Sequence, residues 1–323
     1  MHIALLARLL IRQFHSLSQQ KGGISVQSKS IRKDAYGYLF IAPFFIILTI
    51  FVVYPIIYSF GISFTKWDGS ILSPQFVGVE NYKRLFGDKF FMKSVSNTWI
   101  MWLGCIIPQL IMGLALAVAL TDRKIKGKAF FRWIYYLPNL VTMASVGALV
   151  FFLLDWQSGS INRLLISLGF IKEPINFLQD IFASRFAVSF TLWWMWFGYS
   201  MIIFMAGIRA IPEEYFEAAR VDGGNRWQIF WRITLPCLRP IILYQVVTSL
   251  IGGLTMFDVP YVLSGGNGAP QNSTLTMVMY LYNTTFANYN FGYGATIGVG
   301  LFVLVIMVVA VAYRLINRKS LYE

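Results

Sequence analysis

The 323-residue sequence holds few side chains that could carry out covalent chemistry, and these are not grouped. Cys105 and Cys237 stand apart, with neither a C-x-x-C motif nor a histidine pair to complete a zinc site. No paired carboxylates and no nucleophile beside a base occur at a spacing that suits catalysis. The phosphate-binding motif G-x-x-x-x-G-K-[ST] is also absent. We therefore expect a chain that is not an enzyme and has no catalytic residue, metal or cofactor of its own.

The most patterned polar segment covers residues 210–236, and its residue types predict a short helical hairpin. Pro212 suits the first position of a helix, and Glu213 and Glu214 follow where the helix dipole favours negative charge. Gly223 is a natural end for this helix, because glycine readily adopts a positive φ. Such an element is too polar to lie in lipid and can fit a groove in a partner protein, although a hairpin with solvated charges is the plainer alternative.

The second half of this segment predicts another short helix. Asn225 can cap it, and Ile229, Phe230 and Ile233 would lie along one face. Pro236 is expected to end it, because proline cannot continue a helical hydrogen-bond ladder.

The elements that carry the hairpin are expected to span a membrane. Hydrophobic residues make up 57% of the chain and charged residues only 13%, which is too apolar for a soluble domain. Six stretches are long enough to cross about 30 Å of hydrocarbon: 38–64, 98–120, 133–154, 186–208, 241–263 and 293–316. The predicted fold class is all-α, a polytopic membrane protein with six transmembrane helices. Gly252 and Gly253 interrupt the fifth stretch, either by ordinary tolerance or because a broken helix lines a transport path.

The positive charge is unevenly distributed over the connections. Most of the 27 Lys and Arg residues precede the first stretch, follow the last, or lie between stretches two and three and between four and five. The positive-inside rule therefore places both termini in the cytoplasm, and the net charge of +13 reflects orientation, not nucleic-acid binding.

The predicted organisation has three parts. Residues 1–37 form a cytoplasmic tail, within which residues 1–14 are either a helix at the membrane surface or unstructured. Residues 38–316 form the transmembrane domain, including a cytoplasmic loop over 209–240. Residues 317–323 form a second cytoplasmic tail.

Part of the loop resembles a known motif. Glu217-Ala218-Ala219, followed by Gly223 and the segment ending at Pro236, is similar to the EAA loop of permeases in binding-protein-dependent ABC importers. The resemblance implies that the loop docks into an ATPase subunit and that Glu217 pairs with a basic residue there. It assigns this coupling role to Glu213, Glu214, Glu217, Ala218, Ala219, Asp222 and Gly223.

Three further segments, 76–82, 126–132 and 257–266, resemble carbohydrate-uptake permeases of the maltose-transporter type. This resemblance covers nearly the whole chain from Tyr38 onward. It implies the permease fold and a location in a bacterial inner membrane. The implied partners are a second homologous permease, two ATP-binding cassette subunits that hold ATP and Mg, and a periplasmic solute-binding protein. The implied substrate is an oligosaccharide. No nucleic acid is expected, and membrane lipid surrounds the helices.

Matching the chain to the family's sugar-contacting positions points to Tyr199, Ser249, Gly252, Gly253 and Met256 as the substrate pathway. Tyr199 offers an aromatic face and a hydroxyl, although a helix-packing role is equally open. Gly253 and Met256 stand where related permeases have amides, which predicts a wider and less polar site. The overall pattern also resembles a bacterial alginate importer, which would imply an acidic oligosaccharide.

Asp258 supports the main alternative, a secondary sugar transporter driven by an ion gradient. An acidic residue near a membrane can relay protons or cations. In the resembled family this position lies in an external turn, so we favour a carboxylate that orders a loop. The alternative gives no reason for the hairpin at 210–236.

Overall fold

The computed structural model describes residues 27–71, 73–121 and 125–317. The surface helix expected within residues 1–14 and the last residues of the C-terminal tail lie outside the described residues. The chain divides into two compact units, Met1–Ser59 and Phe60–Glu323.

The described part of the first unit is one long helical segment, which continues for a few residues past Ser59. This segment consists of α2 (Gln27–Leu48), the π-helical turn η1 (Thr49–Val53) and α3 (Tyr54–Ile62). Helix α2 begins well before the expected start at Tyr38. The π-helical turn ends two residues before Pro55, whose missing N–H cannot continue a regular hydrogen-bond ladder. The span Tyr38–Ile62 is apolar on all sides, as suits a helix in lipid.

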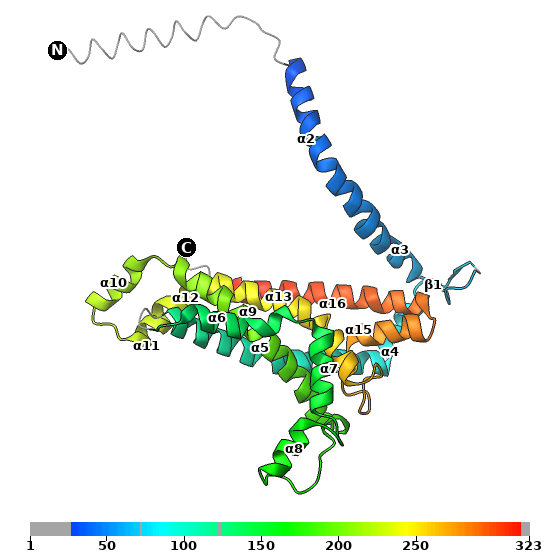
Figure 1. The fold of residues 1–323 in the computed structure, drawn as a ribbon. Helices are drawn as coiled ribbons and strands as arrows, with labels where there is room; N and C mark the ends of the chain where they lie inside the picture. The colour runs from blue at the N-terminus through cyan, green and yellow to red at the C-terminus, as the bar shows by residue number, and fades with distance from the viewer. Residues whose placement is uncertain (1–26, 72, 122–124, 318–323) are drawn as a thin grey trace, which may run out of the picture. The chain divides into compact units, whose positions relative to one another are not determined.

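The second unit is built on long helices that run alongside one another (Figure 1). These are α5 (Lys89–Thr121), α9 (Ile181–Ala210), α13 (Arg239–Leu254) and α16 (Phe291–Asn317). Helix α5 packs along α9, and α13 packs on α16 and α5. A Cβ atom at Gly113 of α5 would lie 2.9 Å from the Ser200 Cβ of α9, so a glycine there permits close helix packing.

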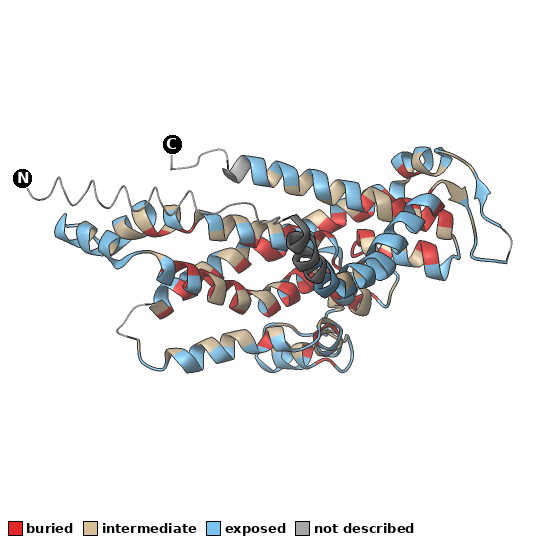
Figure 2. Cartoon of the chain, turned by 90° about the horizontal axis from the view of Figure 1, so that it is seen from above, coloured by how far each residue is buried: buried red, intermediate tan, exposed pale blue. Residues whose placement is uncertain are grey.

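Buried residues collect where the long helices face one another, and residues on the outward faces are mostly exposed (Figure 2). One cluster contains Met101, Val188 and Leu254 from α5, α9 and α13. A second contains Met201, Phe204 and Leu238. Because Leu238 lies directly before α13, this second cluster fixes the start of α13 against α9.

The third expected stretch is not one straight helix. It forms α6 (Lys128–Tyr136), the 3₁₀ turn η2 (Leu137–Leu140) and α7 (Met143–Leu153), and the two parts are bent by 90°. Pro138 lies in the turn, and the Thr142 hydroxyl accepts a hydrogen bond from the Ser145 amide to start α7. The described residues therefore contain five helices able to cross a membrane, or six if the bent pair counts as one span.

Short elements make up the connections. In this unit they include the antiparallel strands β1 (Thr65–Lys66) and β2 (Gln75–Phe76), and the helices α4 (Glu80–Gly87), α8 (Ser160–Ser167), η3 (Phe177–Gln179), α14 (Asp258–Leu263), α15 (Met277–Tyr282) and η5 (Asn283–Ala287). Helices α4 and α15 lie at the end of the bundle opposite the hairpin helices α10 (Glu213–Val221) and α11 (Arg226–Ile229) (Figure 1).

Asp88 joins three elements at the end with α4 and α15. Its Oδ2 accepts hydrogen bonds from the hydroxyls of Tyr280 and Tyr293, both 2.5 Å, and its Oδ1 accepts from the amides of Phe90 and Phe91. Partial burial raises the pKa of the Asp88 carboxyl, but these hydrogen bonds outweigh it, so the pKa lies below its usual 3.8. The carboxylate therefore stabilises the contact between α5, α15 and α16.

Replacing Asp88 with Asn should lower the melting temperature of the detergent-purified protein at neutral pH. Because the pKa in the folded state is lowered, the stabilisation is complete above pH 3.8 and disappears as the pH falls through the lowered pKa. The difference between native protein and variant should therefore shrink in acid. Melting curves from pH 7 to below pH 4 measure this, with the exposed Glu173→Gln as control. If the difference in melting temperature between native protein and variant stays constant over this pH range, the Asp88 carboxylate does not stabilise the fold in this way.

Candidate functional sites: a polar hairpin and a bundle cavity

The segment between α9 and α13 forms the predicted hairpin. Its first helix, α10 (Glu213–Val221), begins one residue later than expected, since Pro212 is the residue that precedes it and not its first position. Glu213 and Glu214 occupy the first turn, as predicted. Gly223 ends the helix with φ of 77°, and the following Gly224 amide donates to the Ala219 carbonyl oxygen, 2.8 Å away.

The second helix, α11 (Arg226–Ile229), starts with the predicted cap. Asn225 accepts a hydrogen bond from the Gln228 amide, and the Gln228 side chain accepts one from the Asn225 amide. The prediction that Pro236 ends this helix is wrong. The chain continues through the π-helical turn η4 (Phe230–Thr234) into α12 (Leu235–Cys237), where Pro236 lies in the first turn and its missing N–H is tolerated.

The predicted coupling residues lie together on α10 and the turn after it. All are exposed except Ala219, which is partly buried: Glu213, Glu214, Glu217, Ala218, Asp222 and Gly223. Within the described residues, the Glu217 carboxylate has no hydrogen-bond or ion-pair partner. The hairpin therefore presents an accessible acidic surface.

Exposed aromatic side chains on α11 and η4 add to this surface and were not predicted from the sequence. Trp227 is 69% exposed and packs edge-on against Trp231. Tryptophan beside Arg226 and Arg232 is a sequence signal for contact with a protein partner or the membrane interface.

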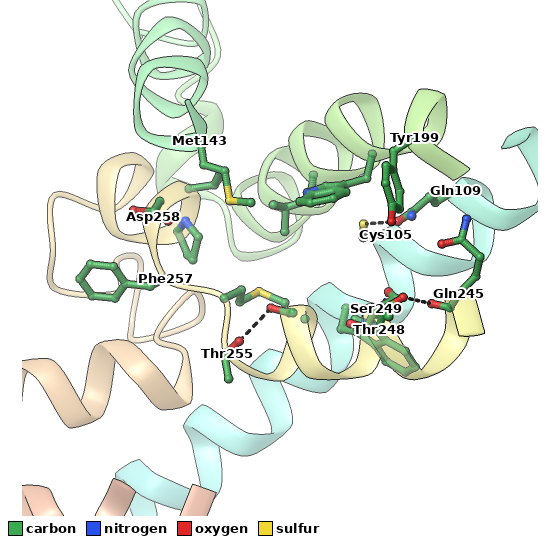
Figure 3. Close-up of a pocket in the computed structure, with 18 residues that line it drawn as sticks. Cys105, Gln109, Met143, Tyr199, Gln245, Thr248, Ser249, Thr255, Phe257 and Asp258 are labelled. Carbon is green, nitrogen blue, oxygen red and sulfur yellow. Dashed lines mark hydrogen bonds between the residues drawn. The ribbon is translucent and has the colours of Figure 1, made fainter. Parts of the chain in front are cut away.

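The five predicted pathway residues meet around one cavity of about 500 Å³ (Figure 3). Its walls come from α5, α9, α13, α14 and the N-terminal end of α7. The fifth expected stretch is broken, but the break comes after Gly252 and Gly253 and not at them. Helix α13 continues through both glycines and ends at Leu254. Residues 255–257 are not helical, and they line the cavity.

Gly253 does not widen the cavity, contrary to the prediction. A Cβ atom there would lie 1.9 Å from Cδ1 of Trp102, so the indole fills the space that a side chain would take. The Trp102 Nε1 donates to the carbonyl and the hydroxyl oxygen of Ser249, at 3.0 and 3.1 Å. Gly252, by contrast, has no atom within 4 Å of a built Cβ and borders open space.

The other two predicted residues, Met256 and Tyr199, differ in how deeply their side chains are buried. Met256 is buried, and its carbonyl oxygen accepts a hydrogen bond from Thr276. The Tyr199 ring is half-buried, meets Trp196 edge-on, and its hydroxyl lies 3.4 Å from that of Tyr244.

Trp102, Gln109 and Gln245 also line the cavity, and reasoning from the sequence missed them. Glutamine within an apolar stretch was the available signal, because an uncharged polar side chain inside a membrane needs a partner. Gln109 has one, since its Nε2 donates to the Ser200 hydroxyl over 2.8 Å.

Asp258 is exposed and occupies the first turn of α14, at the cavity end opposite Gln245 (Figure 3). Within the described part of the chain its carboxylate makes no hydrogen bond, so the loop-ordering role stays a prediction. Among the residues lining the cavity, Asp258 is the single carboxylate, and none is Lys, Arg or His. No group of three or more potential metal ligands occurs among the described residues.

Known proteins resemble this chain in sequence. The family model described as binding-protein-dependent transport system inner membrane component matches residues 109–321. The lactose transport system permease protein LacF of Rhizobium radiobacter is 35% identical over 246 residues, which cover 76% of this chain and 81% of that protein. The arabinooligosaccharides transport system permease protein AraP of Bacillus subtilis is 34% identical over 248 residues, which cover 76% of this chain and 77% of that protein.

Solved structures share the fold. A crystal structure of a bacterial ABC transporter involved in the import of the acidic polysaccharide alginate contains a chain with a TM-score of 0.78 and 24% identity, covering 90% of this chain and 98% of that one. A bacterial alginate ABC transporter in complex with an alginate pentasaccharide-bound periplasmic protein gives a TM-score of 0.79, also at 24% identity, covering 90% and 97%. The bundle with its bent helix pair therefore belongs to a known architecture.

Proposed function

Because the chain belongs to the family of binding-protein-dependent transport system inner membrane components, we propose that it is one permease subunit of an ATP-driven importer for an oligosaccharide. The observation that carries this proposal is the meeting of all five predicted pathway residues around one cavity inside the bundle. Relatives named for lactose and arabinooligosaccharides support a carbohydrate cargo. An acidic oligosaccharide such as alginate is a candidate within this class.

The partners and orientation follow the same proposal. Both termini and the hairpin face the cytoplasm, where two ATPase subunits bind ATP and Mg, and one of them receives α10. A second, homologous permease completes the path, and a periplasmic binding protein delivers the sugar to the end of the bundle with α4 and α15. The charge distribution along the sequence supports this orientation.

The connection between hairpin and cavity supports a mechanical role. From Arg226 the chain is helical through α11, η4 and α12, and Leu238 then leads into α13. Leu238 is fully buried, and a Cβ atom on Gly207 of α9 would lie 2.8 Å from it. Movement of α10 when the ATPases close would therefore be transmitted to α13, which lines the cavity, and would alternate access between the two sides.

Uptake into proteoliposomes that contain the assembled importer tests the proposal. Entry of labelled oligosaccharide should require both internal ATP and the loaded binding protein. An ion-gradient-driven transporter would instead lose uptake when an uncoupler collapses the gradient at constant ATP. Uptake that is independent of ATP would overturn the proposal.

A further inference from the structure

Gln245 is a buried polar side chain for which the fold provides no partner. It lies in α13 and is 2% exposed, and its Nε2 has no hydrogen-bond partner among the described residues. Buried amides are nearly always paired, because an unpaired one loses its hydrogen bonds to water without replacement. Gln245 lines the cavity, at the same end as Gln109 and Tyr199 (Figure 3).

The polar neighbours of Gln245 in the cavity are already engaged. Gln109 donates to Ser200, and its Oε1 accepts a weak hydrogen bond from the Cys105 thiol. The Ser249 hydroxyl accepts from Trp102. None of them pairs with the Gln245 Nε2 in the described part of the chain, so this amide is left open to a group that enters the cavity.

The chemistry of the cavity indicates what that group is. An amide offers both a donor and an acceptor, and a sugar hydroxyl matches both. The rings of Trp196 and Tyr199 supply aromatic faces of the kind that apolar sugar faces contact. A uronic carboxylate would find no basic side chain in this lining and would be repelled by Asp258.

We propose that Gln245 hydrogen-bonds to a hydroxyl of an uncharged sugar unit at the end of the cavity nearer the hairpin. The proposal rests on the proposed importer function and narrows its cargo. Gln245 comes six residues after the start of α13, or about 9 Å along the helix, so the contact lies on the cytoplasmic part of the path.

Substitution of Gln245 by Leu, which keeps its volume but removes the amide, tests the contact in the complete importer. With a neutral oligosaccharide, we expect Q245L to reduce ATP-driven uptake per assembled complex about tenfold, while its melting temperature stays equal or rises because an unpaired amide is gone. Gln179→Leu makes the same chemical change at an exposed site outside the cavity and should leave uptake unchanged. Native uptake by Q245L would overturn the proposal.

Q245E tests the cargo class. A carboxylate can accept from a sugar hydroxyl but no longer donates, so neutral uptake should fall, and uptake of a uronic oligosaccharide should fall more because two carboxylates would face each other. Equal or better uronic uptake in Q245E would overturn the assignment to an uncharged unit. A native importer that moves no saccharide at all would instead refute the proposed function, so the two failures are distinguishable.

Discussion

Replacing Glu217 with Lys should abolish ATP-driven uptake while the permease pair still assembles. Glu217 is exposed on α10 and has no partner in the described part of the chain, so the substitution breaks no contact within the fold. Lysine is also a good helix former, so α10 should persist. At the proposed contact with the ATPase, however, two positive charges would face each other, which costs several kcal/mol and predicts a loss of roughly a hundredfold or more in coupled transport.

The measurement combines uptake in proteoliposomes with co-purification of the ATPase subunits. The matched control is Glu173→Lys, which makes the same charge reversal on an exposed residue outside the hairpin and should transport normally. A reciprocal change of the facing basic residue in the ATPase to Glu should restore uptake of the Glu217→Lys protein. Normal uptake by the single variant would show that α10 is not the docking helix.

The hairpin could be predicted from the sequence because its signals are local. Gly223 and Asn225 fix the turn through their own backbone preferences, and both behave as expected. Pro236 was misread because the rule that proline ends a helix ignores the π-helical turn before it, which lets the chain continue. Local rules fail where a neighbouring element changes the hydrogen-bond pattern.

Most ends of the spans were predictable to within a few residues, but the starts of α2 and α5 lie well before residues 38 and 98, and the directions of the spans were not predictable. Apolar length identifies a segment that can cross a membrane and carries no information on a bend. The 90° bend between α6 and α7 follows from Pro138 and the Thr142 cap. These were visible in the sequence, yet they were read as part of one continuous span.

The cavity shows the limit of sequence reasoning most clearly. Its predicted residues were found by matching the chain to the sugar-contacting positions of the resembled family, whereas Trp102, which fills the space beside Gly253, comes from α5, far away in the sequence. A long-range packing contact of this kind leaves no trace in local patterns. The prediction that glycine widens the site failed for that reason.

Gly253→Ala should therefore destabilise the bundle, although alanine is the better helix former. The added methyl group would lie 1.9 Å from Cδ1 of Trp102, so the indole must move and its two hydrogen bonds to Ser249 must break. Overpacking of this kind typically costs about 1–3 kcal/mol, which exceeds the gain of about 1 kcal/mol in helix propensity. A displaced indole can move only toward the cavity or the core, so we also expect uptake to fall severalfold.

The neighbouring glycine provides the matched control for this substitution. Gly252→Ala adds the same methyl group one residue earlier in the same helix, but nothing lies within 4 Å of it, so the melting temperature should be unchanged or higher. If Trp102 is the cause, shortening it to Leu should make Gly253→Ala less harmful than it is in the native background, because the two sites are in direct contact and their effects cannot add. Equal melting temperatures for the two alanine variants would show instead that the indole has room to move, and that Ser249 is available to the cargo.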